Sequence, residues 1–342
     1  MSPPLRTAII GLSASATTNW AAAAHLPCLL SPTGKTLFTI NALCNSSSAA
    51  ALNAISTFNL DSSVKPYGDP ASLAADPAID LVLCNTRVDK HLETILPSLL
   101  SGKDVYIEWP IASNKNQIDE LVAAAALGGG RVAVGLQGRY APPILRVKEV
   151  LASGKVVIDY IQSVVGDIIP GTDDAHFQIQ RPDIRVRDPQ TDAIVESIKS
   201  DVPDLLSLHG SLPGSSYVCA NASLVAYFLR GQPFPGDPSL LWTLTGETGT
   251  IRLTAYAGIS LQADAYGEPV TIRVHQFDTD EVDEVSWNWS ETQMEVPIRA
   301  RSVQHSLISF ANRDESGYVS LEDAARRAGQ IEGWLDSWRE SP

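Results

Sequence analysis

The sequence has few of the features that mark a metalloprotein, a disulfide scaffold or a membrane protein. Its four cysteines form no CxxC pair and have no clustered His or carboxylate partners at the spacing of metal ligands. No apolar run approaches the roughly 20 residues that a bilayer span needs, and the first residues lack the charged and apolar regions of a signal peptide. We therefore expect small buried cysteines, no metal, no membrane association and a cytoplasmic location.

Basic residues are also scarce. There are 25 Lys and Arg against 39 Asp and Glu, which gives a net charge of -14. The two signs balance over residues 1–150, so the excess of acid lies in the rest of the chain. Because nucleic-acid affinity comes mostly from basic faces that neutralise phosphates, this composition argues against a nucleic-acid partner and against an anionic membrane surface.

The length of 342 residues and a hydrophobic content of 44% predict two globular domains. In the first 150 residues, short apolar runs alternate with longer Ala-rich segments, which is the pattern of βαβ units. We predict a Rossmann-type, doubly wound parallel sheet over residues 1–140. The expected strands are Thr7–Leu12, Leu37–Cys44, Asp80–Thr86, Asp104–Glu108 and Arg131–Gln137, and the expected helices are Asn19–Leu30, Ser47–Phe58, Lys90–Leu100, Lys115–Ala126 and Pro143–Ala152.

After Gly154 the pattern changes to strand-like runs separated by Gly, Pro and Asp, which predicts an α+β domain over residues 141–342 with a mostly antiparallel, open sheet. The segment Ser320–Trp338 has helical periodicity, and we expect it to pack back on the first domain. The expected strands are Asp159–Val165, Leu205–Leu212, Tyr217–Leu229, Leu240–Leu244, Thr250–Ala255 and Val270–Phe277, and the expected loops are Ile169–Ala175, Arg181–Ser200 and Asp278–Glu284.

The turn after the first strand is the first candidate site. In dinucleotide-binding folds this turn carries glycines, which allow the backbone to approach a pyrophosphate at a helix N-terminus. Here Gly11 stands at the first of these positions, with the small residues Ser13 and Ala16 at the other two. The turn therefore either binds a nucleotide or serves only to connect the strand to the helix.

The residues at the end of the second predicted strand indicate whether NAD or NADP would bind. An acidic residue there normally binds the ribose 2′-hydroxyl of NAD, but Asn45 and Ser46 stand in that region. The absence of a carboxylate slightly favours NADP over NAD. A Ser-rich cap of the following helix explains the same residues equally well.

Four motifs stand in order along the first half of the chain. They are Ala8-Ile9-Ile10-Gly11-Leu12-Ser13 with Trp20 and His25-Leu26-Pro27, Leu83-Cys84-Asn85-Thr86 with His91, Tyr106-Ile107-Glu108-Trp109-Pro110, and Leu136-Gln137-Gly138-Arg139. In these motifs the chain resembles the Gfo/Idh/MocA family of NAD(P)-dependent oxidoreductases, and in particular its fungal, Gal80-like branch. The resemblance implies that a dinucleotide lies across Gly11–Ala16, Asn45–Ser46, Asn85–Thr86 with His91, and the Glu108 segment.

The chain departs from the family where catalysis is expected. Trp109 replaces the lysine of the family's Glu-Lys-Pro motif, and no segment after Asp167 matches the helix that supplies the family's proton-transfer histidine. A rebuilt site could use Glu108, Arg139, His91 or His176. Trp109 would shape a pocket that is apolar in part, and Lys90 is a further candidate for a replaced lysine.

Three interpretations remain open at this stage. The chain is an NAD(P)-binding oxidoreductase with a non-standard site, for example in fungal secondary metabolism; a non-redox isomerase or cyclase that uses Glu108 as acid or base; or a Gal80-like regulator with a vestigial nucleotide pocket, a protein partner and access to the nucleus. The resemblance also implies a homodimer formed through the C-terminal sheet. A small-molecule substrate is expected for the first two interpretations.

Overall fold

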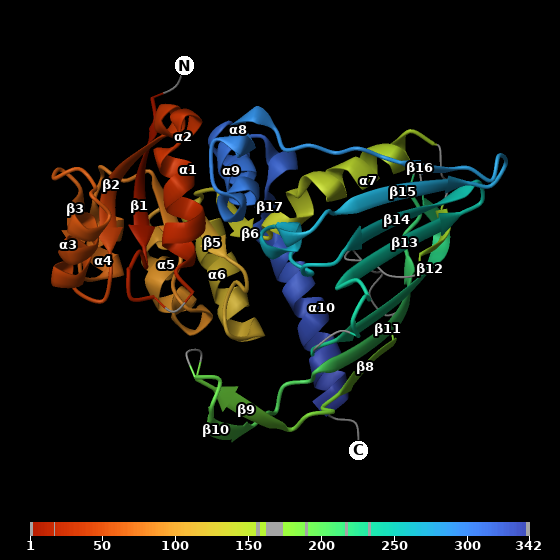
Figure 1. The fold of residues 1–342 in the computed structure, drawn as a ribbon. Helices are drawn as coiled ribbons and strands as arrows, with labels where there is room; N and C mark the ends of the chain where they lie inside the picture. The colour runs from red at the N-terminus through yellow and green to blue at the C-terminus, as the bar shows by residue number, and fades with distance from the viewer. Residues whose placement is uncertain are drawn as a thin grey trace. The chain divides into compact units, whose positions relative to one another are not determined.

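The computed structural model describes residues 3–16, 18–154, 158–161, 174–188, 191–215, 218–231 and 234–339 (Figure 1). Contacts between residues divide the chain into two compact units that interleave along the sequence. Unit 1 comprises Met1–Leu145, Ser260–Asp264 and Asn288–Glu332, and unit 2 comprises Arg146–Ile259, Ala265–Trp287 and Gly333–Pro342.

Unit 1 contains a sheet in which seven described strands are ordered β17-β6-β5-β4-β1-β2-β3. All neighbours pair in parallel except β17, which is antiparallel to β6. The predicted doubly wound parallel sheet is confirmed. Strands β2 and β3 are added on one side of β1, and β4, β5 and β6 are added on the other side, so the strand order reverses between β1 and β4. Open α/β sheets bind ligands at this point. The strands are β1 (Leu5–Ile10), β2 (Phe38–Cys44), β3 (Lys65–Tyr67), β4 (Leu81–Cys84), β5 (Asp104–Glu108), β6 (Val132–Gly135) and β17 (Val319–Ser320).

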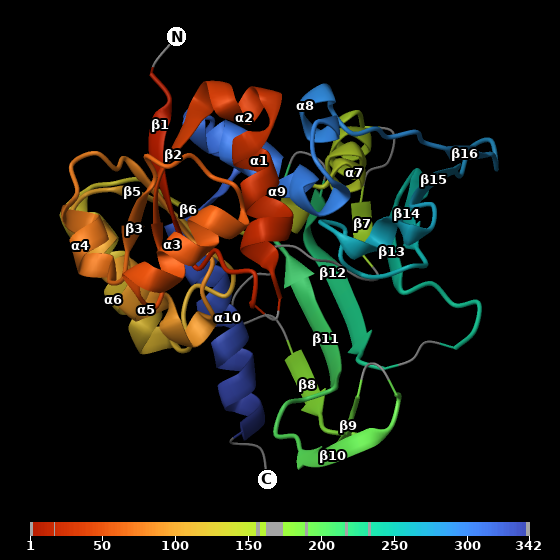
Figure 2. The ribbon, with the colours of Figure 1, turned by 60° about the vertical axis from the view of Figure 1, so that its left-hand side comes forward.

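Helices cover both faces of this sheet (Figure 2). On one face the core includes Leu73, Ile95, Leu121 and Ala324, which come from α4, α5, α6 and α10. On the other face it includes Leu29, Ile55 and Phe310 from α1, α3 and α9. The helices of unit 1 are η1 (Ala21–His25), α1 (Leu26–Leu30), α2 (Pro32–Leu37), α3 (Ser48–Thr57), α4 (Pro70–Ala75), η2 (Val88–Lys90), α5 (His91–Leu100), α6 (Lys115–Gly128), η3 (Gln137–Tyr140), α8 (Glu291–Met294), α9 (Ile298–Ala311), η5 (Glu315–Gly317) and the first part of α10 (Leu321–Arg339).

The helix boundaries follow local sequence signals. The side chains of Ser47, Asp69 and Asn114 accept hydrogen bonds from the backbone N–H groups of the first turns of α3, α4 and α6. Gly129 ends α6 in the left-handed conformation, with φ of 76°. The first turns of α10 (Leu321–Arg339) contribute Leu321 and Ala324 to the core of unit 1.

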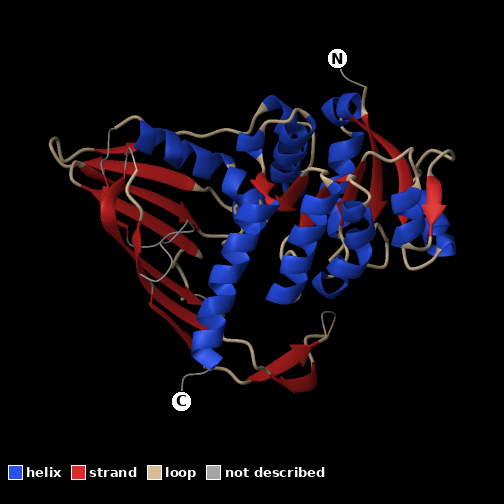
Figure 3. Ribbon diagram, turned by 180° about the vertical axis from the view of Figure 1, so that it is seen from behind, coloured by secondary structure: helices blue, strands red, loops and turns tan. Residues whose placement is uncertain are grey.

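Unit 2 contains a second sheet, in which eight described strands are ordered β16-β15-β14-β13-β7-β12-β11-β8 (Figure 3). Every pair is antiparallel except β7 with β12, so the prediction of a mostly antiparallel sheet is confirmed. The elements of unit 2 also include α7 (Pro142–Ala152), which begins in unit 1, η4 (Asp264–Gly267) and a separate hairpin of β9 and β10. The strands are β7 (Ile158–Ile161), β8 (Asp174–Gln178), β9 (Asp183–Arg187), β10 (Ile194–Lys199), β11 (Leu205–Leu212), β12 (Val218–Leu229), β13 (Leu240–Gly246), β14 (Gly249–Ala255), β15 (Thr271–Gln276) and β16 (Val282–Glu284).

Three predicted loops contain strand residues. β8 begins at Asp174, inside the predicted loop over 169–175. Residues 181–200 were expected to be a loop, but β9 and β10 form an antiparallel hairpin there. Charged residues alternate with Ile and Val along β9, and the β-branched residues Ile194, Val195 and Ile198 of β10 favour a strand. The prediction of a loop over 278–284 is wrong at its end, where β16 pairs with β15. Most of the predicted loop over 169–175 and part of the predicted strand over 159–165 lie outside the described residues.

Three of the four cysteines are buried. Cys28, Cys44 and Cys84 are buried as expected, and burial raises the pKa of Cys44 to about 12. The expectation is wrong for Cys219, which is exposed on β12. Among the described helices, none is both long and apolar enough to span a bilayer, and no group of three or more potential metal ligands occurs among the described residues.

Candidate functional site

The candidate site lies in unit 1, at the edge of the sheet where β1, β4 and β5 end. Gly11 follows β1 with φ of 90°, a conformation that residues with a side chain rarely adopt. Its N–H donates to the carbonyl of Cys44, and a Cβ at this position would lie 2.9 Å from the carbonyl oxygen of Asn85. Only glycine therefore allows the ends of the neighbouring strands to approach this closely.

The predicted phosphate-binding residues lie in the turn between β1 and the first helix. Ser13 Oγ lies 3.0 Å from Ser15 Oγ, and the N–H of Ala16 donates to the carbonyl of Ser13. The turn is thus folded on itself, and helical structure begins near Trp20. Gly11, Ser13 and Ala16 thus lie in one folded turn at the carboxyl end of β1.

Two residues after β2, Asn45 and Ser47, make hydrogen bonds that stabilise the neighbouring turn and helix. Asn45 Nδ2 donates to the carbonyl of Leu12 at 3.0 Å and to that of Ala50 at 3.4 Å, which ties the end of β2 to the turn after β1. Ser46 is exposed, and Ser47 caps α3. None of the described residues 45–48, which directly follow β2, carries a carboxylate.

Asn85, directly after β4, is the clearest sign of an incomplete site. Its side-chain Oδ1 and Nδ2 are both buried and neither has a hydrogen-bond partner among the described residues. Its backbone N–H donates to Ile10, which holds it next to Gly11. A buried amide without partners costs about 1–3 kcal/mol per lost hydrogen bond, so a polar ligand at this edge would relieve that cost.

His91 and Thr86 support the loops around this edge. The buried ring of His91 lies between two carbonyl oxygens, with Nε2 2.9 Å from Thr86 O and Nδ1 3.1 Å from Ile111 O. Thr86 Oγ1 lies 3.3 Å from Thr94 Oγ1 and 3.4 Å from Cys84 Sγ. His91 therefore joins the loop after β4 to the loop after β5.

Glu108 ends β5 inside a cluster of polar side chains. Its Oε1 lies 2.5 Å from Nε2 of His25, a side chain that is 0% exposed, while Gln137 Nε2 donates to both carboxylate oxygens at 2.9 and 3.1 Å. Gln137 Nε2 also lies 3.3 Å from the hydroxyl of Tyr106, whose pKa is raised well above its ordinary value by burial. The Glu108 carboxylate is only 13% exposed, so it is held by the fold and does not project freely into solvent.

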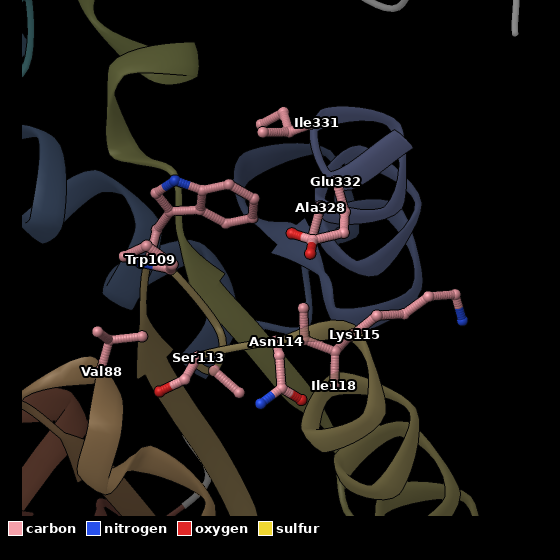
Figure 4. Close-up of a pocket in the computed structure, with 11 residues that line it drawn as sticks. Val88, Trp109, Ser113, Asn114, Lys115, Ile118, Ala328, Ile331 and Glu332 are labelled. Atoms are coloured by element: carbon pink, nitrogen blue, oxygen red, sulfur yellow. The ribbon is translucent and has the colours of Figure 1, made fainter. Parts of the chain in front are cut away.

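Trp109 lies on the other side of the same strand end. It is half-buried against the core formed by β4, β5, α5, α6 and α10, and it lines a cavity of about 300 Å³ (Figure 4). Glu108 and Trp109, although adjacent in sequence, therefore belong to different environments. Lys90 is in η2, where it pairs with Glu93 at 3.1 Å.

The remaining catalytic candidates are not part of these clusters. Arg139 is exposed in η3, and His176 is exposed on β8 of unit 2, with Nε2 2.8 Å from Gln178 Nε2. His176 lies in an antiparallel strand pair, because β8 pairs with β11 and places His176 opposite Ser207. The part of the chain where the histidine helix was sought, residues 162–173, lies outside the described residues.

Sequence reasoning missed two partners of Glu108. His25 and Gln137 were noted only as parts of motifs, and nothing in their spacing indicates that they meet Glu108. The available signal was chemical: a carboxylate at the end of an apolar strand needs hydrogen-bond donors, and His25 and Gln137 are donors in neighbouring βαβ connections.

The residues present fit a dinucleotide. The backbone next to Gly11 leaves no room for a Cβ, and the unpartnered amide of Asn85 lies beside it at the strand-order reversal. Gly11, Asn85 and the turn through Ala16 would hold such a group, which would supply a hydride acceptor or donor.

The N-terminal part of the chain matches a known family model. Residues 5–136 match the sequence model of the Gfo/Idh/MocA oxidoreductase family, described as an NAD-binding Rossmann fold. A dehydrogenase of Aspergillus oryzae, aclE, is 26% identical over 382 residues, which covers 98% of this chain and 97% of that protein.

Gal80 proteins are also similar. The galactose/lactose metabolism regulatory protein GAL80 of Saccharomyces cerevisiae is 29% identical over 159 residues, which covers 45% of this chain and 35% of that regulator. The crystal structure of a super-repressor mutant of Gal80p from S. cerevisiae has a TM-score of 0.81 at 20% identity, and the match covers 98% of this chain and 96% of that one. At this identity the structural match establishes the fold alone.

Proposed function

Since residues 5–136 are a Gfo/Idh/MocA NAD-binding Rossmann domain in a chain with a Gal80-like fold, as the motifs predicted, we propose that this protein is an NAD(P)-dependent oxidoreductase with a non-standard active site. The observation that carries the proposal is the buried, unpartnered amide of Asn85 beside Gly11. A dehydrogenase that matches nearly the whole chain supports enzymatic activity.

In this proposal the nucleotide lies across Gly11, the Asn45–Ser46 edge and Asn85. The amide of Asn85 would donate to and accept from the bound nucleotide, and the N–H groups of the turn through Ala16 would face its phosphates. Because no carboxylate follows β2, nothing at this position repels a 2′-phosphate, which favours NADP over NAD.

Glu108 acts here as a positioning residue. Its carboxylate accepts hydrogen bonds from His25 and Gln137, so it holds the first helix and η3 at the end of β5. Trp109 carries no ammonium group that would stabilise an alkoxide, and its indole offers an apolar surface to a substrate. We therefore propose a substrate that is apolar in part, and a setting in fungal secondary metabolism, supported by the fungal dehydrogenase relative.

Trp109 also favours a second candidate function. Loss of the lysine of the Glu-Lys-Pro motif removes the ammonium group that would stabilise an alkoxide, and part of the chain is similar to a regulatory protein. A regulator without catalysis would keep the nucleotide pocket as a sensor and would bind a protein partner. The two candidates differ in whether bound nucleotide ever changes its redox state.

Nucleotide titration tests the binding step. Isothermal titration with NAD and NADP is compared between the parent protein, Asn85→Leu and the exposed control Asn53→Leu on α3. Removing an unpartnered buried amide should leave the free energy of unfolding equal or higher, while loss of hydrogen bonds to the ligand should weaken binding about tenfold or more. Equal affinity of the parent and Asn85→Leu would contradict the proposed site.

Absorbance of the reduced nicotinamide tests the chemistry. Free sugars and polyols should show no turnover with NAD or NADP, because the lysine-assisted route is missing, whereas alcohols on apolar rings are the expected substrates. Turnover of a free sugar would contradict the role assigned to Trp109. If NAD or NADP binds tightly but no alcohol reduces it, the result would favour the second candidate function, a regulator without catalysis.

A further inference from the structure

A cavity beside Trp109 is formed by residues of unit 1 alone. Its volume of about 300 Å³ is at the lower end of the range for small-molecule sites. Four segments line it: η2, the residues after β5, α6 and α10. The apolar residues of its wall include Val88, Trp109, Ile118, Ala328 and Ile331. The cavity is therefore large enough for one or two fused rings.

The wall presents one large flat surface among aliphatic side chains. Trp109 is half-buried, and Figure 4 shows its indole directed toward α10, with Val88 and Ile118 lining the opposite part of the cavity. A flat ring laid on the indole buries apolar area on both of its faces and gains an aromatic stacking contact, whereas a thicker saturated ring cannot stack. The wall therefore favours a planar ring.

The charged side chains that line the cavity all have partners in the described part of the chain. Lys115 Nζ pairs with Asp119 at 2.5 Å, and Glu332 is not free either. Asn114 Oδ1 accepts from the N–H of Gln117 as the cap of α6. Figure 4 shows the amide of Asn114 and the ammonium group of Lys115 directed away from the indole. A charged ligand would lose hydration here without gaining a free counter-charge, so the cavity favours an uncharged one.

We propose that this cavity binds an uncharged compound with one or two flat, fused rings, and that a ring of this compound lies on the indole of Trp109. The inference rests on the proposed function only where the ligand is taken to be the substrate, in which case the apolar part of that substrate is a planar ring. Binding needs no nucleotide, since none of the five wall residues named above is among those assigned to the dinucleotide.

Four matched probes test the proposal by isothermal titration of the full chain without nucleotide: 2-naphthylmethanol, its fully saturated analogue decahydro-2-naphthylmethanol, 2-naphthylmethylamine and 2-naphthoate. We expect the planar alcohol to bind about tenfold more tightly than the saturated alcohol, and tenfold corresponds to about 1.4 kcal/mol. The saturated alcohol is no less apolar, so this preference reports flatness and not hydrophobicity.

The amine and the carboxylate measure the effect of charge, and neither should bind more tightly than the planar alcohol. Three results would overturn the proposal: equal affinity of the two alcohols, tighter binding of either charged probe, or no binding of the planar alcohol.

Variants at Trp109 test the role of the indole. Trp109→Leu should remove the preference for the planar alcohol, whereas Trp109→Phe, which keeps a flat ring, should retain most of it. Trp338→Leu is the matched control, because Trp338 lies on α10 but does not line the cavity, and this variant should bind both alcohols like the parent protein. Circular dichroism verifies that each variant is folded. An unchanged preference in folded Trp109→Leu would refute the assigned role of the indole.

A substitution on α10 tests the position of the ligand. Ile331→Trp should fill the cavity and block the planar alcohol, whereas Ile259→Trp, at an isoleucine that is 52% exposed and does not line the cavity, should leave its affinity unchanged. Binding of the planar alcohol to Ile331→Trp with the affinity of the parent protein would place the ligand elsewhere and overturn the proposal.

The outcome is independent of the nucleotide experiment. If the planar alcohol binds as expected but neither NAD nor NADP does, the cavity is a ligand site and the oxidoreductase proposal fails. If the nucleotides bind and the planar alcohol does not, the cavity proposal fails and the oxidoreductase proposal stands.

Discussion

Glu108 and His25, which are 83 residues apart in the chain, meet at the end of β5 with 2.5 Å between Oε1 and Nε2. His25 is fully buried, and its Nδ1 has no hydrogen-bond partner among the described residues. The ring also lies edge-on to Tyr106, with 5.4 Å between centroids. This contact joins η1, which follows the turn after β1, to β5, which ends at Glu108.

Removing the Glu108 carboxylate should destabilise unit 1. In Glu108→Ala the buried side chains of His25 and Gln137 lose their acceptor, and we expect the free energy of unfolding to fall by about 2–4 kcal/mol. Glu108→Gln retains an acceptor and should cost less than about 1.5 kcal/mol. Urea unfolding of the two variants measures the difference.

The same pair of variants tests the role of Glu108 in the reaction. If Glu108 only positions its neighbours, Glu108→Gln should retain most of the turnover of the parent protein. Loss of turnover in a stable Glu108→Gln variant would instead assign acid–base chemistry to this carboxyl.

A side chain at Gly11 should abolish nucleotide binding. Gly11→Val places a Cβ 2.9 Å from a backbone carbonyl oxygen, where the backbone and a pyrophosphate would meet. Gly129→Val is a matched control, because Gly129 also has positive φ but no atom lies within 4 Å of its Cβ position. Gly11→Ala is a milder second variant if Gly11→Val does not fold.

Both valine variants should lose about 1–2 kcal/mol of stability from backbone strain, but only the Gly11 variants should lose nucleotide affinity in isothermal titration. Binding retained by a folded Gly11 variant would refute the proposed position of the dinucleotide.

Stability should fall at low pH partly because of Asp76. Its carboxylate accepts hydrogen bonds from Lys65 Nζ at 2.7 Å, Tyr67 Oη at 2.6 Å and the N–H of Ala78 at 2.8 Å, which hold the pKa of Asp76 far below its ordinary value. Because the pKa is lower in the folded state, this contribution is complete above the unfolded-state pKa of about 4 and is lost as the pH falls toward the folded-state value.

Urea unfolding between pH 7 and pH 2.5 measures this effect. In Asp76→Asn the free energy of unfolding should be lower at pH 7, and its decline below about pH 4 should be shallower than in the parent protein. Asp119→Asn, in an exposed pair on α6, should follow the parent curve. A parallel decline in Asp76→Asn and the parent would contradict the assignment.

We propose that the chain forms a homodimer through the eight-stranded sheet. The strand register places Tyr227, Leu229 and Leu241 on the same face, where they are 65%, 44% and 46% exposed. Such an apolar patch commonly marks a protein interface. The double variant Tyr227→Arg and Leu241→Arg should be monomeric in light scattering after size exclusion, whereas Leu127→Arg on α6 should not change the mass. A monomeric parent protein would contradict this proposal.

Prediction from sequence succeeded where local pattern determines structure. Apolar runs such as Asp104–Glu108, which becomes β5, are recognisable because strands of a parallel sheet are buried on both faces. The hairpin of β9 and β10 was missed because its strands are largely exposed and carry charges between Ile and Val, a composition that is also typical of loops.

The order of apolar runs, the turn at Gly11 and the motifs around Glu108 were therefore sufficient to predict a Rossmann domain and the family that it resembles, whereas the position of a nucleotide at the edge of the sheet stays a prediction. Tertiary packing alone showed that Glu108 is held by His25 and Gln137, and that Trp109 faces α10 with Glu332 directed toward it. The physical reason is the separation along the chain of the residues that interact. Periodicity and turn residues report the neighbours of a residue along the chain, whereas a buried carboxylate or an indole obtains its chemistry from groups that come together only when distant segments pack.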